Sequence, residues 1–175
     1  ATGIDAMVHA IEAFTGQHKK NMMSDVFAKE ALRLMTANLI TACQDGTNRA
    51  AREAMLLGAN LAGQAFSNSP VGAVHALAYP LGGHYHLPHG LTNALMLGPV
   101  LRYNMTAAAP LYAELADVVV GPSDEGTQAK SANFVNFMQD LMDRSGAPLK
   151  LRDVKVPEAD LRSEEHTSEL QSQGN

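Results

Sequence analysis

The chain has 175 residues, enough for one domain with a buried core, and its 46% hydrophobic content, rich in Ala, Leu and Met, favours helices over strands. The formal net charge of −5 gives no reason to expect nucleic acid or an anionic membrane as a partner, and no apolar run is long enough to span a bilayer. Cys43 is the single cysteine, which excludes a disulfide framework and indicates a reducing, cytoplasmic setting.

Apolar residues recur at three- and four-residue steps along most of the chain, which is typical of helices. The first helix is expected to be capped by Thr2 and to end at Gly16, and Asn104 is expected to end the fifth. The later helices are expected over residues 25–42, 50–66, 72–81, 90–103, 111–120 and 127–145. Residues 82–88 are expected to form a loop with two glycines, and 149–161 a mixed, charged stretch. Strand patterns are nearly absent, so the sequence predicts an all-α helical bundle.

The two ends of the chain look unlike the rest. It begins at Ala1 without an initiator Met, already inside a helical pattern. Residues 162–175 are polar, lack a core-forming period, and resemble a translated sequencing-library adapter. The alternative is a solvated helix capped by Ser163, although His166 stands where a capping box has Glu or Gln. We therefore expect one helical domain over residues 1–161, truncated at both ends, followed by an artefactual tail.

Asp5 and His9 lie four residues apart in an apolar helical context, so their side chains face the same way. A buried carboxylate needs a partner, and a bound cation is one answer. The alternative is a simple Asp–His contact on a helix surface, because this spacing alone is a weak motif.

Four histidines fall within fifteen residues around two glycines and two prolines, in the segment HALAYPLGGHYHLPH (residues 75–89). His75 and His89 should not share a helix, but a loop that folds back would bring both imidazoles together. The alternative is one core histidine and one loop histidine. His84 and His86 are expected to be exposed or to lie at the rim of a cleft. Carboxylate and imidazole together suit divalent metals such as iron(II) and zinc.

These segments together resemble the iron-containing (group III) alcohol dehydrogenases. The resemblance is carried by GIDAMVHAIEA (3–13), AFSN (65–68), HALAYPLGG (75–83), LPHG (87–90) and the residues from Asn93 to Asn104, in the family's order, and covers about residues 1–161. It implies the C-terminal helical half of a two-domain, dehydroquinate synthase-like architecture. The α/β nucleotide-binding half is missing, and the chain has no Gly-x-Gly-x-x-Gly run.

The resemblance also implies a metal site and a reaction. Its metal ligands match Asp5, His9, His75 and His89 in this sequence, with Fe²⁺ the usual ion and zinc possible. The implied reaction interconverts an alcohol with an aldehyde or ketone by hydride transfer to or from NAD or NADP, which would bind mainly to the missing domain. A homo-oligomer is expected for the intact protein, and this chain alone is expected to be inactive.

The resemblance assigns substrate and catalytic roles as well. Phe66 matches an aromatic residue that lines the substrate pocket, although a core phenylalanine at the end of a helix is an equal alternative. Many members carry a second histidine four residues after the first, where this chain has Tyr79. A tyrosine can donate or accept a hydrogen bond but has a far higher reference pKa, so proton transfer is expected to differ. We expect Tyr79 and His84 to be the catalytic groups beside the metal.

Two other functions are compatible with parts of this pattern. The maleylacetate reductase branch resembles the same fold but works without metal, and the intact Asp and three His argue against it. A non-enzymatic helical metal-binding module has the same composition, but does not account for several motifs in this order.

Overall fold

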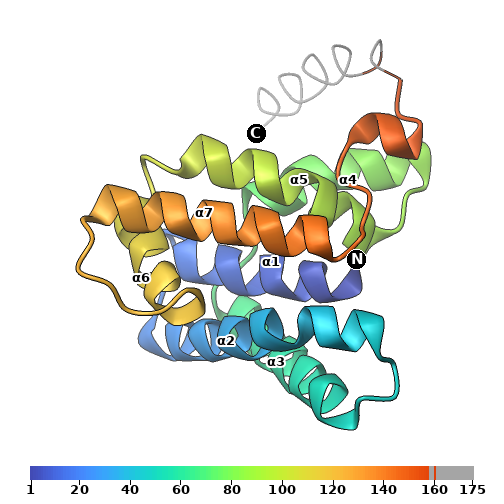
Figure 1. The fold of residues 1–175 in the computed structure, drawn as a ribbon. Coiled ribbons are helices and arrows are strands. Elements are labelled where there is room, and N and C mark those ends of the chain that lie inside the picture. Colours follow the sequence, from blue (N-terminus) through green and yellow to red (C-terminus); the bar gives the residue numbers. More distant parts are fainter. Residues whose placement is uncertain (158–159, 161–175) are drawn as a thin grey trace.

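A computed structural model describes residues 1–157 and 160 of the chain. The predicted tail at 162–175 lies outside the described residues. The described part is helical, with no strand (Figure 1). In chain order the elements are α1 (Thr2–Thr15), α2 (Met22–Gln44), α3 (Arg49–Asn68), α4 (Ala73–Tyr85), α5 (His89–Asn104), α6 (Ala109–Val119), α7 (Thr127–Arg144) and a 3₁₀ turn η1 (Leu151–Val154). The predicted all-α bundle is confirmed.

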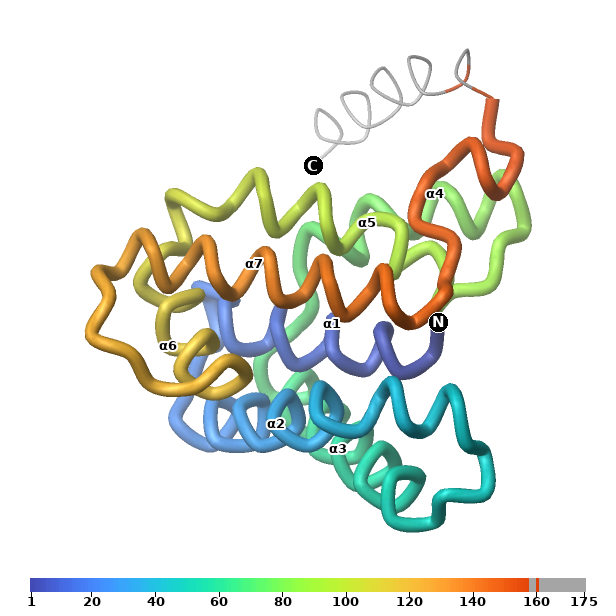
Figure 2. The backbone as a smooth tube through the Cα atoms, viewed as in Figure 1, coloured from blue at the N-terminus to red at the C-terminus, as the bar shows by residue number. Residues whose placement is uncertain are grey.

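Helix α1 lies at the centre of the bundle. The paired helices α2 and α3 pack on one side of it, and α5 and α7 lie on the other, as the ribbon and the tube both show (Figures 1 and 2). Its buried residues point in nearly every direction around the helix, which is the pattern of a helix enclosed by others. They are Ile4, Met7, Val8, Ala10, Ile11, Glu12, Ala13 and Phe14. A polar group on α1 is therefore held in the middle of the molecule.

Side-chain caps begin the two helices that cover α1. The Asn21 side chain accepts a hydrogen bond from Ser24 N at the start of α2, and Asn48 accepts one from Ala51 N at the start of α3, both at 3.0 Å. Each bond satisfies a backbone N–H that has no partner within its own helix. The predicted ends of two other helices are confirmed, since Gly16 follows the last residue of α1 and α5 ends at Asn104.

Two predictions about helix ends are wrong. Thr2 does not cap α1: it lies inside the helix, whose N-cap Ala1 makes no side-chain cap bond. The loop expected from residue 82 begins later, because α4 continues through both glycines to Tyr85. A helical glycine costs only about 1 kcal/mol, which the burial of Leu81 against the bundle can outweigh. The turn is made instead by His86, at φ 53° and ψ 30°.

None of the helices in the described part of the chain has the length and apolar character that crossing a membrane requires.

Candidate metal centre

Helix α1 supplies two of the four predicted ligands. Asp5 and His9 are one turn apart and half-buried, so the helix presents both on one face, towards α4 and α5. The apolar residues around them pack into the core and fix the helix in place. The prediction that these two side chains lie together on a buried helix is confirmed.

The turn between α4 and α5 brings the other two ligands to the same point. His75 lies in the first turn of α4 and is almost wholly buried, whereas His89 is the first residue of α5 and half-exposed. The left-handed conformation of His86, followed by Pro88, reverses the chain between them. Their ring centroids are 5.3 Å apart, although they are fourteen residues apart in sequence. The prediction that the chain folds back and brings these two imidazoles together is confirmed.

The four side chains converge on one small volume. Ligand atoms of Asp5, His9, His75 and His89 all lie within 4.8 Å of one another. His9 Nε2 is 3.1 Å from His75 Nε2, and Asp5 Oδ1 lies 3.9 Å from His75 Nε2 and 3.8 Å from His89 Nε2. One carboxylate and three imidazoles are a donor set that divalent iron or zinc accepts.

The buried amide of Asn93 tests whether a cation fits here. Its Nδ2 lies 2.5 Å from Asp5 Oδ1, 3.1 Å from His75 Nε2 and 3.2 Å from His89 Nε2. An NH₂ group has two hydrogens, so it cannot donate to three acceptors at once. Its own Oδ1 is buried without a hydrogen-bond partner among the described residues. The arrangement has more acceptors than donors, and a cation would satisfy the excess.

The lowered pKa of His9 favours metal binding. Burial lowers the pKa of His9 below its ordinary value; the Asp5 charge opposes this, whereas His75 and His89 act in the same direction as burial. The neutral imidazole, with a free nitrogen lone pair, is the form that binds a metal.

Glu12 is a site residue that the sequence analysis did not identify. Its side chain is buried, and Oε2 lies 2.6 Å from His75 Nδ1 while Oε1 accepts a hydrogen bond from Val74 N at 2.6 Å. It follows Asp5 by seven residues and His9 by three, so all three occupy one face of α1. That spacing was the available signal. Asn93 was missed similarly, one turn after His89 on α5.

The predicted substrate and catalytic residues differ in their placement. Phe66, at the end of α3, stacks on His9 with ring centroids 4.5 Å apart. Tyr79 lies one turn after His75 on α4, stacks on His89 at 6.2 Å and is 58% exposed, so its ring borders the candidate site. His84 is in the last turn of α4, is not one of the four converging ligands, and its ring contacts Tyr85. His86 is exposed, as predicted.

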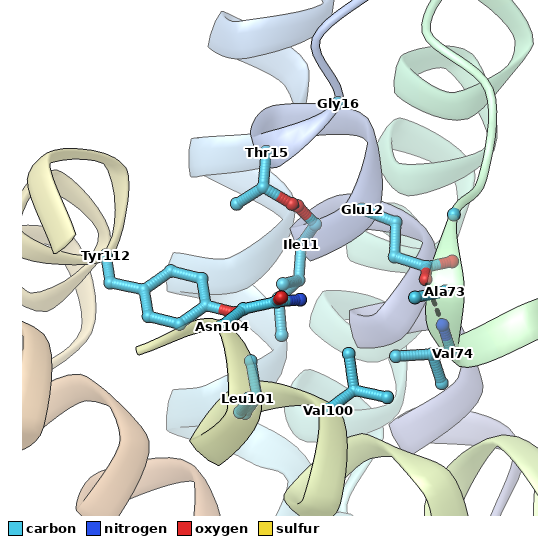
Figure 3. A pocket seen from close by; sticks show the side chains of 11 residues that line it. Ile11, Glu12, Thr15, Gly16, Ala73, Val74, Val100, Leu101, Asn104 and Tyr112 are labelled. Carbon is cyan, nitrogen blue, oxygen red and sulfur yellow. Dashed lines mark hydrogen bonds between the residues drawn. The ribbon is translucent and has the colours of Figure 1, made fainter. Parts of the chain in front are cut away.

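A separate pocket of about 150 Å³ lies behind Glu12 (Figure 3). Tyr112 and Asn104 line it across from the Glu12 carboxylate, and burial raises the pKa of Tyr112 to about 12. The lining described for this pocket includes none of the four converging ligands. The centre and the pocket are therefore two sites that share one residue, Glu12.

Comparison with known proteins identifies a family and related enzymes. The model of the "Fe-containing alcohol dehydrogenase family, C-terminal" matches residues 1–169. The 1,3-propanediol dehydrogenase of Citrobacter freundii is 40% identical over 162 residues, which are 91% of this chain and 41% of that protein. The chain thus spans well under half the length of such relatives.

Solved structures share the fold. That of a 1,3-propanediol oxidoreductase matches with a TM-score of 0.86 and 38% identity, over 91% of this chain and 42% of that one. The maleylacetate reductase of Rhizobium sp. strain MTP-10005 matches with a TM-score of 0.80 and 30% identity, over 93% and 43%. This chain corresponds to part of each.

Proposed function

Because the chain belongs to the iron-containing alcohol dehydrogenase family, to whose C-terminal part it corresponds, we propose that it forms the metal-binding half of an NAD(P)-dependent alcohol dehydrogenase. The convergence of Asp5, His9, His75 and His89 within 4.8 Å carries this proposal. The substrate would be a small alcohol, converted to an aldehyde or ketone, or the reverse. The nicotinamide nucleotide would be held mainly outside this chain.

We assign the four side chains to one divalent metal, with iron(II) as the expected ion and zinc as the other candidate. When bound, such a metal supplies Lewis-acid chemistry, which lowers the pKa of an alcohol hydroxyl or polarises a carbonyl. The chain's own contribution is position: α1 fixes two ligands rigidly, and the first turns of α4 and α5 present the other two.

The residues beside the centre would shape the substrate site. Phe66 covers one side of His9, which keeps water from that imidazole and offers an apolar surface to a substrate chain. Tyr79 is the exposed polar group next to His89, so its hydroxyl can hydrogen-bond a substrate oxygen. His84 remains a proposed catalytic group at the far end of α4. We further propose a cytoplasmic homo-oligomer.

A metal-independent reduction is the second candidate, because the maleylacetate reductase structure shares the fold. The excess of acceptors around Asn93 favours the metal-dependent reaction over this alternative. Without a cation, the Asp5 carboxylate and the three imidazoles would have only the Asn93 amide and their own ring protons as hydrogen-bond donors.

The test is an anaerobic iron(II) titration of the full 175-residue chain, with helicity recorded by circular dichroism. We expect one tight site, weakened by about a hundredfold or more in His89→Ala, since one of four ligands is lost. His18→Ala is the matched control, because His18 is exposed and remote from the centre. A folded wild-type chain that binds neither iron(II) nor zinc would refute the metal site and favour the metal-independent reductase.

The enzymatic part of the proposal needs the chain joined to a nucleotide-binding domain. In that longer protein, His89→Ala should lower metal content and alcohol oxidation together. Loss of activity with unchanged metal content would contradict the ligand assignment.

A further inference from the structure

Glu12 makes two contacts, and both hold the first turn of α4. Its Oε2 lies 2.6 Å from His75 Nδ1, the ring nitrogen that faces away from the candidate centre. Its Oε1 accepts a hydrogen bond from Val74 N at 2.6 Å, in the first turn of α4. One carboxylate on α1 therefore holds both the backbone and the ring of the helix that carries His75.

The backbone contact replaces a helix cap that the sequence of α4 lacks. The N-cap residue of α4 is Gly72, which has no side chain to accept a hydrogen bond from the first turn. Glu12 supplies that acceptor from a neighbouring helix, and its negative charge lies at the positive end of the α4 dipole. Figure 3 shows this bond as the dashed line between the two residues. The start of α4 is thereby tied to the most buried helix of the bundle.

The ring contact selects one tautomer of His75. A carboxylate only accepts hydrogen bonds, so the Nδ1 that faces it has to carry the proton. The Nε2 of a neutral imidazole then has a free lone pair, and this atom faces His9 and Asn93 in the centre. His75 is almost wholly buried, so the ring has no route to a different orientation through solvent.

Charge favours the same arrangement. Glu12 is buried, and an ionised carboxylate in the interior requires compensation. Its two hydrogen bonds supply part of it. Together with Asp5, it offers two negative charges to a centre that would hold one divalent cation, so the sum of these charges is zero.

We propose that Glu12 is a positioning residue of the metal centre, which holds α4 in place and fixes His75 as the Nδ1–H tautomer so that Nε2 binds the metal. This inference rests on the proposed function for the identity of the ligand. The tautomer itself does not depend on a metal, so the two proposals can be tested separately. Partners of this kind commonly change metal affinity by about 10- to 100-fold when they are removed.

The informative variant is Glu12→Gln. Its amide oxygen can still accept from Val74 N, but its NH₂ then faces His75 Nδ1 and drives the proton to Nε2, which blocks the metal lone pair. We expect iron(II) or zinc to bind about 10- to 100-fold more weakly to the folded variant. The matched control is Glu114→Gln, an acid-to-amide change at an exposed residue that pairs with Lys29.

A spectroscopic measurement would distinguish the proposed role of Glu12 from a purely structural one. The ¹⁵N shifts of the histidine rings in the metal-free chain should report Nδ1–H for His75 in wild type and Nε2–H in Glu12→Gln. Metal affinity of folded Glu12→Gln within about threefold of wild type would overturn the proposal, since a positioning partner is worth more than that. If Glu12→Gln does not fold, the wild-type spectrum decides: Nε2–H at His75 overturns it.

The same experiment separates the two proposals. A wild-type chain that binds no divalent metal but shows the Nδ1–H tautomer refutes the metal-dependent function and upholds the Glu12 contact. A chain that binds metal but shows no effect of Glu12→Gln refutes only the inference.

Discussion

Helices α1 and α4 each supply proposed ligands to the candidate centre, yet they are built in different ways. Helix α1 is buried along most of its length, and its proposed ligands interrupt a continuous apolar core. Helix α4 contains Pro80 and two glycines and exposes Leu77 and Tyr79. The first helix is held by packing, whereas the second also depends on polar contacts made at its start.

This difference indicates different roles for the two helices in the candidate site. A helix fixed by the core can hold Asp5 and His9 at a constant position whether or not a metal is bound. A helix with weak internal propensity takes its position from its contacts, which here include Glu12 and the proposed ligands as well as the buried Leu81. We therefore expect changes in α1 to alter the stability of the whole domain, and changes in α4 to alter the centre.

The largest effect is expected from Phe14→Ala on α1. The ring is fully buried and packs in the central cluster, so its removal should lower the free energy of unfolding by about 3–5 kcal/mol. Chemical denaturation followed by circular dichroism measures this loss. Leu57→Ala is the control, because that side chain on α3 is 53% exposed and its change should cost less than about 0.5 kcal/mol. Equal losses would remove the distinction between packed and exposed positions.

Removal of the metal should leave the two helices with unequal protection from hydrogen exchange. At a concentration about 100 times the dissociation constant, a bound metal stabilises the folded site by about 2.7 kcal/mol. Amides of α4 that exchange through opening of the site should therefore exchange up to about a hundredfold faster after chelation. Amides in the middle of α1 exchange only when the whole domain opens, so they should stay slower than the α4 amides before and after chelation. Hydrogen exchange measured by NMR or mass spectrometry decides this, and α4 amides as slow as those of α1 after chelation would contradict it.

A smaller effect is expected at Gly90, where α5 approaches α1 closely. A Cβ added at Gly90 would lie 3.3 Å from Thr2 Cα and 3.4 Å from Asp5 Cβ. The backbone of α1 cannot move away as a flexible side chain could, so Gly90→Ala should displace His89 from Asp5 by a few tenths of an ångström. We expect metal affinity to fall by about tenfold, within the range seen when ligand orientation is disturbed.

The control for that change is Gly63→Ala on α3. An added Cβ there meets nothing within 4 Å, and alanine favours a helix by up to about 1 kcal/mol over glycine. This variant should be at least as stable as wild type and bind metal equally well. If Gly90→Ala also keeps full affinity, the close approach does not set the ligand spacing.

The sequence predicted the two halves of the site unequally well. The convergence of the four proposed ligands could be predicted, because Asp5 and His9 are one helical turn apart and the motifs around His75 and His89 carried a family resemblance. The full length of α4 was not predicted, because two glycines in a row are a local signal for a loop. The burial that outweighs them is a property of the tertiary structure.

Glu12 and Asn93 were overlooked for a related reason. Each is one further turn along a helix from a predicted ligand, at a position where a polar residue on an exposed face would look the same in sequence. Their roles depend on what the neighbouring helix places opposite them. For Glu12 that is the backbone of Val74, whose partner no local pattern specifies.

The smallest effect on the centre is expected from Tyr79→Phe, and it sharpens the comparison most directly. The ring stack on His89, at 6.2 Å and 15°, is kept, and only the exposed hydroxyl is lost. Metal affinity should stay within about threefold of wild type, because no ligand or ligand partner is removed. In a longer protein that turns over alcohol, the same change should lower the rate through the lost hydrogen bond to substrate, by up to about a hundredfold. A large loss of metal would instead mean that Tyr79 supports His89, and that α4 positions ligands along two turns rather than one.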